Sequence, residues 1–97
     1  MDKTLEGFIG SYLHLEVAYE GLADTRDVLK TFSGDAVESL KQNFAQLIAS
    51  RELSALAYGY LTQMEFESDQ ALYAYLQDVY DFLFNSAQKE PEPPPYG

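Results

Sequence analysis

The chain has no cysteine and no tryptophan, and it carries few basic residues for its length. Without cysteine, neither a disulfide framework nor a thiolate metal site can form. No apolar run approaches the roughly 18 residues that a membrane-spanning helix needs, and the first residues do not combine a basic segment with an apolar one as a secretory leader does. We therefore expect a cytoplasmic protein.

The shortage of basic residues leaves a large negative charge. Six lysine and arginine residues stand against sixteen aspartate and glutamate residues, which gives a formal net charge of -10. Phosphates would be repelled, so nucleic acid and anionic membranes are poor partners. A cationic protein surface is the natural complement, because a field of this sign speeds association. The alternative interpretation is that the acidity only keeps the protein soluble.

The length and the apolar spacing predict one helical domain. Ninety-seven residues suffice for a single core, and apolar residues three and four apart indicate helices. We expect a helix from Asp2 to about His14 and four more whose apolar stripes span residues 28–32, 37–48, 53–61 and 72–83. The fourth stripe consists of Leu53, Leu56, Ala57, Tyr60 and Leu61. The expected N-caps are Asp24 or Thr25, Ser33 or Asp35, Ser50, and Ser68 or Asp69.

The remaining segments are expected to be connections or tail. Residues 15–22 have no steady period and include a glycine, and residues 62–68 alternate polar with apolar, as in a brief extended piece. From Ala87 onward the prolines prevent a helix. We therefore expect an all-α, compact single-domain bundle of about five helices (residues 1–86) with a disordered, flexible Pro-rich tail (residues 87–97). Within the tail, Pro93 to Tyr96 match the short pattern that WW domains bind, but a plain disordered end is favoured.

Few residues could carry catalysis. His14 is the single histidine, so a nucleophile would have no other imidazole as its base. We expect His14 to be structural, at the C-terminal end of a helix. The glycines are scattered and match neither a P-loop nor a dinucleotide fingerprint. The sequence therefore predicts no enzyme, no catalytic residue and no cofactor.

Two groups of acidic residues also fit structural roles better than chemistry. Glu65, Glu67 and Asp69 alternate as in a calcium loop, but the glycine and the later glutamate that such a loop needs are absent. Asp78 and Asp81 share a helix face, where carboxylates are more often solvated than paired as acid and base. No metal site is predicted.

The distribution of charge points to a binding surface. No basic residue lies between Arg51 and Lys89, whereas six acidic residues do. Tyr73 and Tyr80 fall among these acids and off the core stripe of the last helix, an arrangement typical of protein interfaces; packing of both against neighbouring helices is an equally weighted alternative. The predicted partner-binding residues are Glu65, Glu67, Asp69, Tyr73, Asp78, Tyr80 and Asp81, with Glu16, Tyr19 and Glu20 as a second patch.

Three stretches resemble a known family. The first runs from Leu5 to His14 (LEGFIGSYLH) and is similar to the opening helix of small bacterial immunity proteins from contact-dependent growth inhibition systems, often called CdiI. Asp24 to Phe32 is similar to the D-T-x-x-x-V-x-x-F helix of that family with a small register difference, and Leu47 to Leu56 to a later L-L-A-S pattern. The likeness covers about residues 5 to 85. It departs at Leu15 to Val17, where the family often has Q-D-W.

The resemblance implies a protein that binds and neutralises the cognate C-terminal domain of a large exported toxin of the CdiA type, in a one-to-one complex. Many such toxin domains are nucleases, whose substrate-binding surfaces must be basic, so an acidic inhibitor can occupy the surface by imitating phosphate charge. The alternative hypothesis is an acidic helical adaptor or regulatory subunit that binds an unrelated basic protein.

Overall fold

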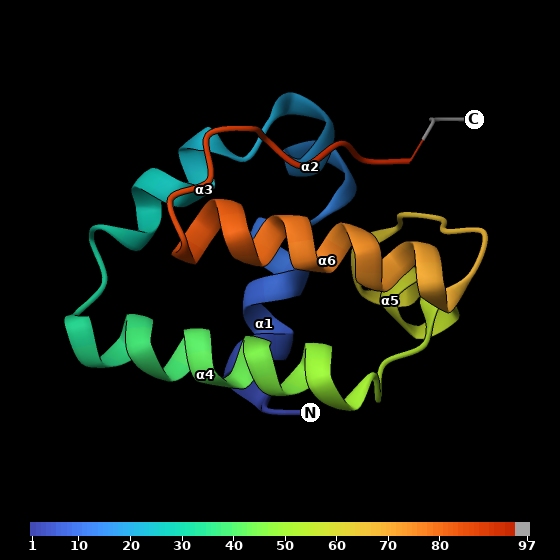
Figure 1. The fold of residues 1–97 in the computed structure, drawn as a ribbon, viewed down its shortest axis with the longest axis horizontal. Coiled ribbons are helices and arrows are strands. Elements are labelled where there is room, and N and C mark those ends of the chain that lie inside the picture. Colours follow the sequence, from blue (N-terminus) through green and yellow to red (C-terminus); the bar gives the residue numbers. More distant parts are fainter. Residues whose placement is uncertain (95–97) are drawn as a thin grey trace.

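The computed structural model describes residues 1–94, and all of its regular secondary structure is helical (Figure 1). The described helices are α1 (Lys3–Tyr12), α2 (Leu15–Glu20), α3 (Ala23–Leu29), α4 (Gly34–Ser50), α5 (Ala55–Thr62) and α6 (Asp69–Phe84). None of these helices is long and apolar enough to cross a bilayer. The predicted all-α class and single compact body are confirmed, and residues 1–94 hold one helix more than expected.

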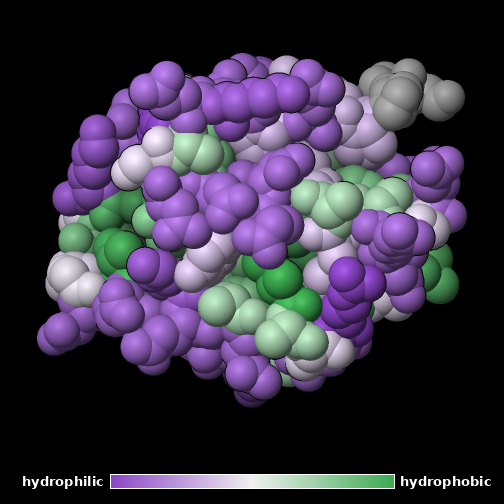
Figure 2. Space-filling view, viewed as in Figure 1, coloured by the Kyte–Doolittle hydropathy of each residue, from purple (hydrophilic) through white to green (hydrophobic). Residues whose placement is uncertain are grey.

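The core lies between the two long helices and α1, and on the face that Figure 2 shows, hydrophilic residues cover most of the surface. α4 and α6 pack side by side, and α1 crosses behind them and contacts α4 and α5 (Figure 1). The ring of Phe44 in α4 lies 5.9 Å from that of Tyr80 and 6.0 Å from that of Phe84, both in α6. Large residues with less than 2% exposure fill the centre: Leu5, Ile9, Leu13, Leu22, Phe44, Leu47, Tyr58, Met64, Leu72, Leu76, Val79 and Phe82.

Serine caps define three of the helix starts. The hydroxyls of Ser33, Ser54 and Ser68 each accept a hydrogen bond, of 3.0 to 3.1 Å, from the amide three residues further along. Such a bond satisfies an amide that the helix itself leaves unpaired. Ser33 and Ser68 were among the predicted caps. The prediction of Ser50 is wrong, because Ser50 is the last residue of α4, and Arg51, whose φ of 52° is left-handed, is the C-cap of that helix.

The segment expected to be a connection contains α2. The inward-facing positions are Leu15, Ala18 and Leu22, and they span too few residues to show a helical period. Gly21 ends the helix with a φ of 113°. His14 is the N-cap of α2, not the C-terminal residue of a longer α1. Its Nδ1 accepts from the amide of Glu16 at 3.4 Å, which fits the structural role expected for the histidine.

The start of α3 also differs from the prediction. The helix begins at Ala23, one residue before the expected cap Asp24, and no side chain of its own N-cap accepts a bond. The amide of Ala23 instead donates to Oε1 of Glu90 in the tail at 3.1 Å. Thr25, the other expected cap, is buried, and its hydroxyl donates to the carbonyl oxygen of Tyr12 at 3.2 Å.

The Pro-rich segment forms no helix, as predicted, and up to Pro94 it lies across α3 and α2 (Figure 1). Besides the bond from Ala23 to Glu90, Arg26 donates to the carbonyl oxygen of Ala87 at 3.4 Å, and Pro91 is buried. The WW-type pattern ends at Tyr96, and residues 95–97 lie outside the described residues, so neither this pattern nor the favoured disordered end is tested there.

Candidate partner-binding surface

The loop between α5 and α6, residues 63–68, separates its apolar and acidic side chains. Met64 is fully buried and Phe66 is half-buried, whereas Glu65 and Glu67 are exposed. The ring of Phe66 lies 5.7 Å from that of Tyr58 and anchors the loop on the core. The predicted alternation of polar and apolar side chains is therefore present in the structure, although no strand forms. As a result, the carboxylates of Glu65 and Glu67 project from the surface.

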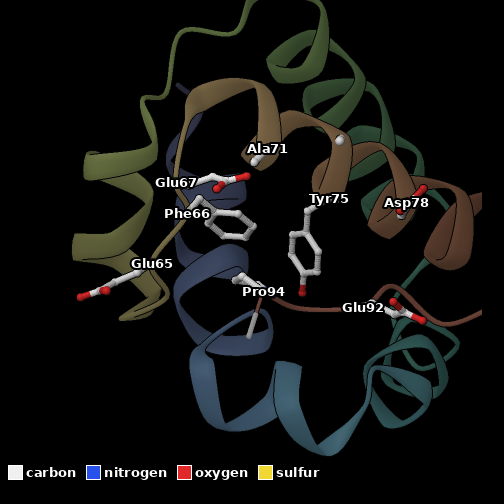
Figure 3. Close-up of a pocket in the computed structure, with 9 residues that line it drawn as sticks. Glu65, Phe66, Glu67, Ala71, Tyr75, Asp78, Glu92 and Pro94 are labelled. Carbon is white, nitrogen blue, oxygen red and sulfur yellow. The ribbon is translucent and has the colours of Figure 1, made fainter. Parts of the chain in front are cut away.

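One cavity lies on the α6 side of this loop. Its volume is about 790 Å³, and Figure 3 shows its lining between the loop, α6 and the tail. Ala71 and Ala74 leave α6 without large side chains here, so the helix face is hollow. We call this space the Tyr75 cavity; its lining residues are Glu65, Phe66, Glu67, Ala71, Ala74, Tyr75, Asp78, Glu92 and Pro94.

The carboxylates around the Tyr75 cavity are largely unneutralised. Within residues 1–94, Glu65, Glu67 and Asp78 are exposed and form no hydrogen bond or ion pair. Glu92 lies 3.9 Å from Nζ of Lys89, but these side chains are 83% and 84% exposed. Water screens an ion pair of this kind, so the potential around the cavity is negative.

A second hollow lies on the α5 side of the same loop. Its volume is about 600 Å³, and Glu65, Phe66 and Glu67 line it as they line the first. Leu56 and Tyr60, one turn apart on α5, stand beside it with 71% and 81% exposure. We call it the Tyr60 groove. Large apolar and aromatic side chains are thus presented to solvent next to carboxylates.

The exposure of Leu56 and Tyr60 corrects the predicted stripe. α5 is apolar nearly all round, so spacing alone does not show which side faces inward. The buried residues are Tyr58 and Thr62, which leaves the expected core residues Leu56 and Tyr60 outside. A surplus of apolar residues on so short a helix is the signal that could have revealed them.

Asp69 fixes the geometry of this surface. It is exposed at the first position of α6, and its Oδ1 accepts from the amide of Ala55, the first residue of α5, at 2.7 Å. A carboxylate at a helix N-terminus is favoured by the helix dipole. This bond holds the starts of both helices together, so Asp69 lines the Tyr60 groove and supports it as well.

The second predicted patch joins the first through the tail. Glu16, Tyr19 and Glu20 lie on α2 and are exposed, and the hydroxyl of Tyr19 donates to the carbonyl oxygen of Pro94. Pro94 also lines the Tyr75 cavity, so the tail links α2 to the wall of that cavity. Glu92 and Pro94 complete a surface that the sequence did not indicate, because the tail was expected to be disordered and flexible.

Two predicted tyrosines do not belong to this surface. Tyr73 is only 2% exposed, so its expected place on the surface is wrong. Tyr80 is half-buried, with its ring 5.9 Å from that of Phe44 and 5.4 Å from that of Phe84. Both pack against neighbouring elements, which was the alternative reading of their spacing.

Asp81 lies further along α6 and is half-buried. Its Oδ1 accepts from the side-chain amides of Gln77 at 3.2 Å and Asn85 at 3.0 Å. Asp81 and Asp78 both line a smaller hollow, of about 220 Å³, that also includes Lys89. With two amides on one oxygen and a lysine nearby, Asp81 offers less free charge to a partner than Asp78.

Tyr75 is the least satisfied polar group of the surface. It is 5% exposed, and its hydroxyl has no hydrogen-bond partner; the hydroxyl of Tyr58, in the core, shares this condition. Burial raises the pKa of Tyr75 above its ordinary value of 10.0, and Tyr19 raises it further. The ring of Tyr75 was correctly expected to lie on the inward stripe of α6, but its place at a cavity was not foreseen.

Within residues 1–94, no three histidine, aspartate or glutamate side chains gather closely enough to hold a metal ion. No protein-family model, curated protein or solved structure shows significant similarity to this chain.

Proposed function

We propose that this protein binds a basic protein through the surface formed by the Tyr60 groove and the Tyr75 cavity, and that it acts by occlusion and not by catalysis. The observation that carries the proposal is the exposure of Leu56 and Tyr60 beside Glu65 and Glu67, which have no ion pair within the described residues.

This combination favours a protein partner over a small cation. Binding energy in protein interfaces is concentrated in a few large side chains, tyrosine prominent among them, that lose water at the centre of the contact. Tyr60 and Leu56 offer such anchors, 81% and 71% exposed. The surrounding carboxylates mainly raise the association rate and disfavour acidic partners. The complementary surface of the partner is therefore basic and has an apolar region that contacts these side chains.

We further propose that the partner is the C-terminal domain of a contact-dependent growth inhibition toxin, and that this protein is its immunity protein in the cytoplasm. The resemblance of Leu5 to His14 to that family supports this step. A nuclease domain is the class of toxin that best fits the charge, because an enzyme that holds phosphates must present lysine and arginine. The carboxylates around the loop would take the place of those phosphates.

Growth protection is the experiment. The proposed partner, a toxin domain expected to be encoded directly upstream, is expressed in cells together with the wild-type protein, with Tyr60→Ala, with Glu67→Lys or with Glu38→Lys. Tyr60 and Glu67 are exposed, so neither change should affect folding. Glu38 is exposed on α4, and its reversal alters the net charge by the same amount as the reversal of Glu67.

The expected result is full protection by the wild-type protein and by Glu38→Lys, with weaker protection by Tyr60→Ala and Glu67→Lys. Loss of an exposed aromatic anchor typically costs about 2 kcal/mol or more in binding, a factor of roughly 30 in affinity. Equal protection by all four proteins would place the interface elsewhere, and no protection by the wild-type protein would remove the immunity function.

A further inference from the structure

The hydroxyl of Tyr75 is an unpaired polar group at the wall of a cavity. The side chain is 95% removed from solvent, and its oxygen has no hydrogen-bond partner. Figure 3 shows the ring projecting from α6 toward the stretch of tail that carries Glu92 and Pro94. Burying a hydroxyl without a partner destabilises a protein, so a role for this group in binding would explain its presence.

The rest of the cavity wall defines what could satisfy that hydroxyl. Glu65, Glu67, Asp78 and Glu92 surround the space with carboxylates. Phe66 and Tyr75 contribute aromatic rings whose centroids are 5.3 Å apart at 45°. A ligand for this wall must therefore be positively charged, and it must donate several hydrogen bonds while contacting ring surface.

We propose that the Tyr75 cavity binds the guanidinium group of an arginine side chain presented by the partner protein, with the Tyr75 hydroxyl and the surrounding carboxylates as acceptors. This assignment rests on the proposed function. Guanidinium is planar, carries five N–H donors and stacks on aromatic rings, whereas the lysine ammonium is compact and strongly hydrated. The bare helix face at Ala71 and Ala74 leaves room for a flat group.

Entry of the guanidinium shifts the tail. The Tyr75 oxygen has almost no exposed area, and Pro94 lines the cavity with it while accepting a hydrogen bond from Tyr19. A donor reaches the hydroxyl when Pro94 moves aside. Signals from Tyr19 and the tail should therefore change together with those of Glu67 and Asp78 on binding.

The test is an NMR titration of the full chain with three small probes: acetyl-arginine amide, acetyl-lysine amide and acetyl-citrulline amide, the uncharged shape analogue of arginine. The arginine probe should shift backbone amide signals of residues 65–67 and 71–78 and bind at least threefold more tightly than the lysine probe. The citrulline probe should cause no saturable shift. Equal binding of arginine and lysine probes, or shifts confined to other regions, would overturn the assignment.

Two matched variants measure the contribution of the Tyr75 hydroxyl to arginine binding. Tyr75→Phe removes it from the cavity, whereas Tyr58→Phe removes the other unpaired hydroxyl, which lies in the core and lines neither hollow. Tyr75→Phe should weaken arginine binding roughly tenfold, the worth of one hydrogen bond to a charged group, and Tyr58→Phe should leave it unchanged. Unchanged binding by Tyr75→Phe contradicts the proposal. If Tyr75→Phe fails to fold, Asp78→Asn, an exposed change, must weaken arginine binding instead.

The result of the arginine titration is independent of the result of the growth-protection assay. Failure of the arginine probe with intact protection would remove this site and keep the proposed function. Specific arginine binding without protection would keep the site and remove the immunity function.

Discussion

The hydroxyl of Tyr73 makes two hydrogen bonds to the backbone of Leu53: it donates to the carbonyl oxygen at 2.8 Å and accepts from the amide at 3.1 Å. The two residues are twenty positions apart, so these bonds tie the first half of α6 to the connection between α4 and α5. The guanidinium of Arg51 lies over the same ring at 5.4 Å from its centroid. Tyr73 therefore positions the start of α5, on which the exposed Leu56 and Tyr60 stand.

Tyr73→Phe should destabilise the protein by about 1–3 kcal/mol, because it leaves both backbone groups of Leu53 without this partner. Tyr80→Phe is the matched control, since Tyr80 is on the same helix and its hydroxyl makes no hydrogen bond within residues 1–94; it should change stability by less than about 0.5 kcal/mol. Urea unfolding measures both. Equal effects of the two changes would show that the Leu53 contact contributes nothing.

Removal of either unpaired hydroxyl should increase the stability of the protein. Tyr58→Phe and Tyr75→Phe each delete an oxygen that is buried without a partner and keep the ring. Both variants should be more stable than the wild-type protein by roughly 1 kcal/mol at pH 7. Thermal and urea unfolding report the change. A loss of stability in Tyr75→Phe would mean that its hydroxyl is satisfied in solution.

The same two tyrosines predict a loss of stability in alkali. Burial raises the pKa of Tyr58 and Tyr75 above the ordinary value of 10.0. Above pH 10 the unfolded chain releases these protons while the native state keeps them, so the free energy of unfolding falls as pH rises. Each buried tyrosine contributes a slope of up to about 1.4 kcal/mol per pH unit until its native pKa is reached.

Urea unfolding between pH 9 and pH 11.5 should accordingly show a shallower decline in Tyr58→Phe and Tyr75→Phe than in the wild-type protein. Identical slopes in all three proteins would contradict the raised pKa values. Lysine deprotonation occurs in the same range but is common to the three proteins, so it cancels in the comparison.

Gly21→Ala should destabilise the protein by about 1–3 kcal/mol. The residue has a φ of 113°, a conformation that side chains rarely adopt, and an added Cβ would lie 3.2 Å from Oε1 of Glu90. Gly7→Ala is the control: it lies within α1 with nothing within 4 Å of a new Cβ, and it should stabilise by roughly 0.5–1 kcal/mol. If Gly21→Ala is also stabilising, the tail does not hold this turn as described.

Local patterns predicted the elements whose length exceeds a few turns. The stripes of α4 and α6 and the caps Ser33 and Ser68 lie where the spacing placed them, because long amphipathic helices bury the same face that their sequence marks. The alternation of Met64 to Glu67 was likewise visible, and it gave the two glutamates at the centre of the surface.

What the sequence could not show depends on contacts between distant residues. Glu90 caps α3 from sixty-seven positions away, so no local pattern marks Ala23 as a helix start. Tyr73 is buried because Leu53 offers two backbone groups to its hydroxyl, which spacing within α6 does not reveal. The orientation of α5 is decided by its packing on α1, so the exposure of Tyr60 emerged only from the fold.

The most direct test of the account is the salt dependence of binding between this protein and the proposed partner, a toxin domain expected to be encoded directly upstream, measured by stopped-flow from 25 mM to 500 mM NaCl. If the carboxylates around Glu65 and Glu67 meet a basic surface, the association rate of the wild-type protein and of Glu38→Lys should fall at least tenfold over this range, because salt screens exposed charges. Glu67→Lys should associate more slowly at low salt and show a weaker dependence. A rate that is independent of salt, or one that Glu67→Lys and Glu38→Lys alter equally, would contradict the central claim.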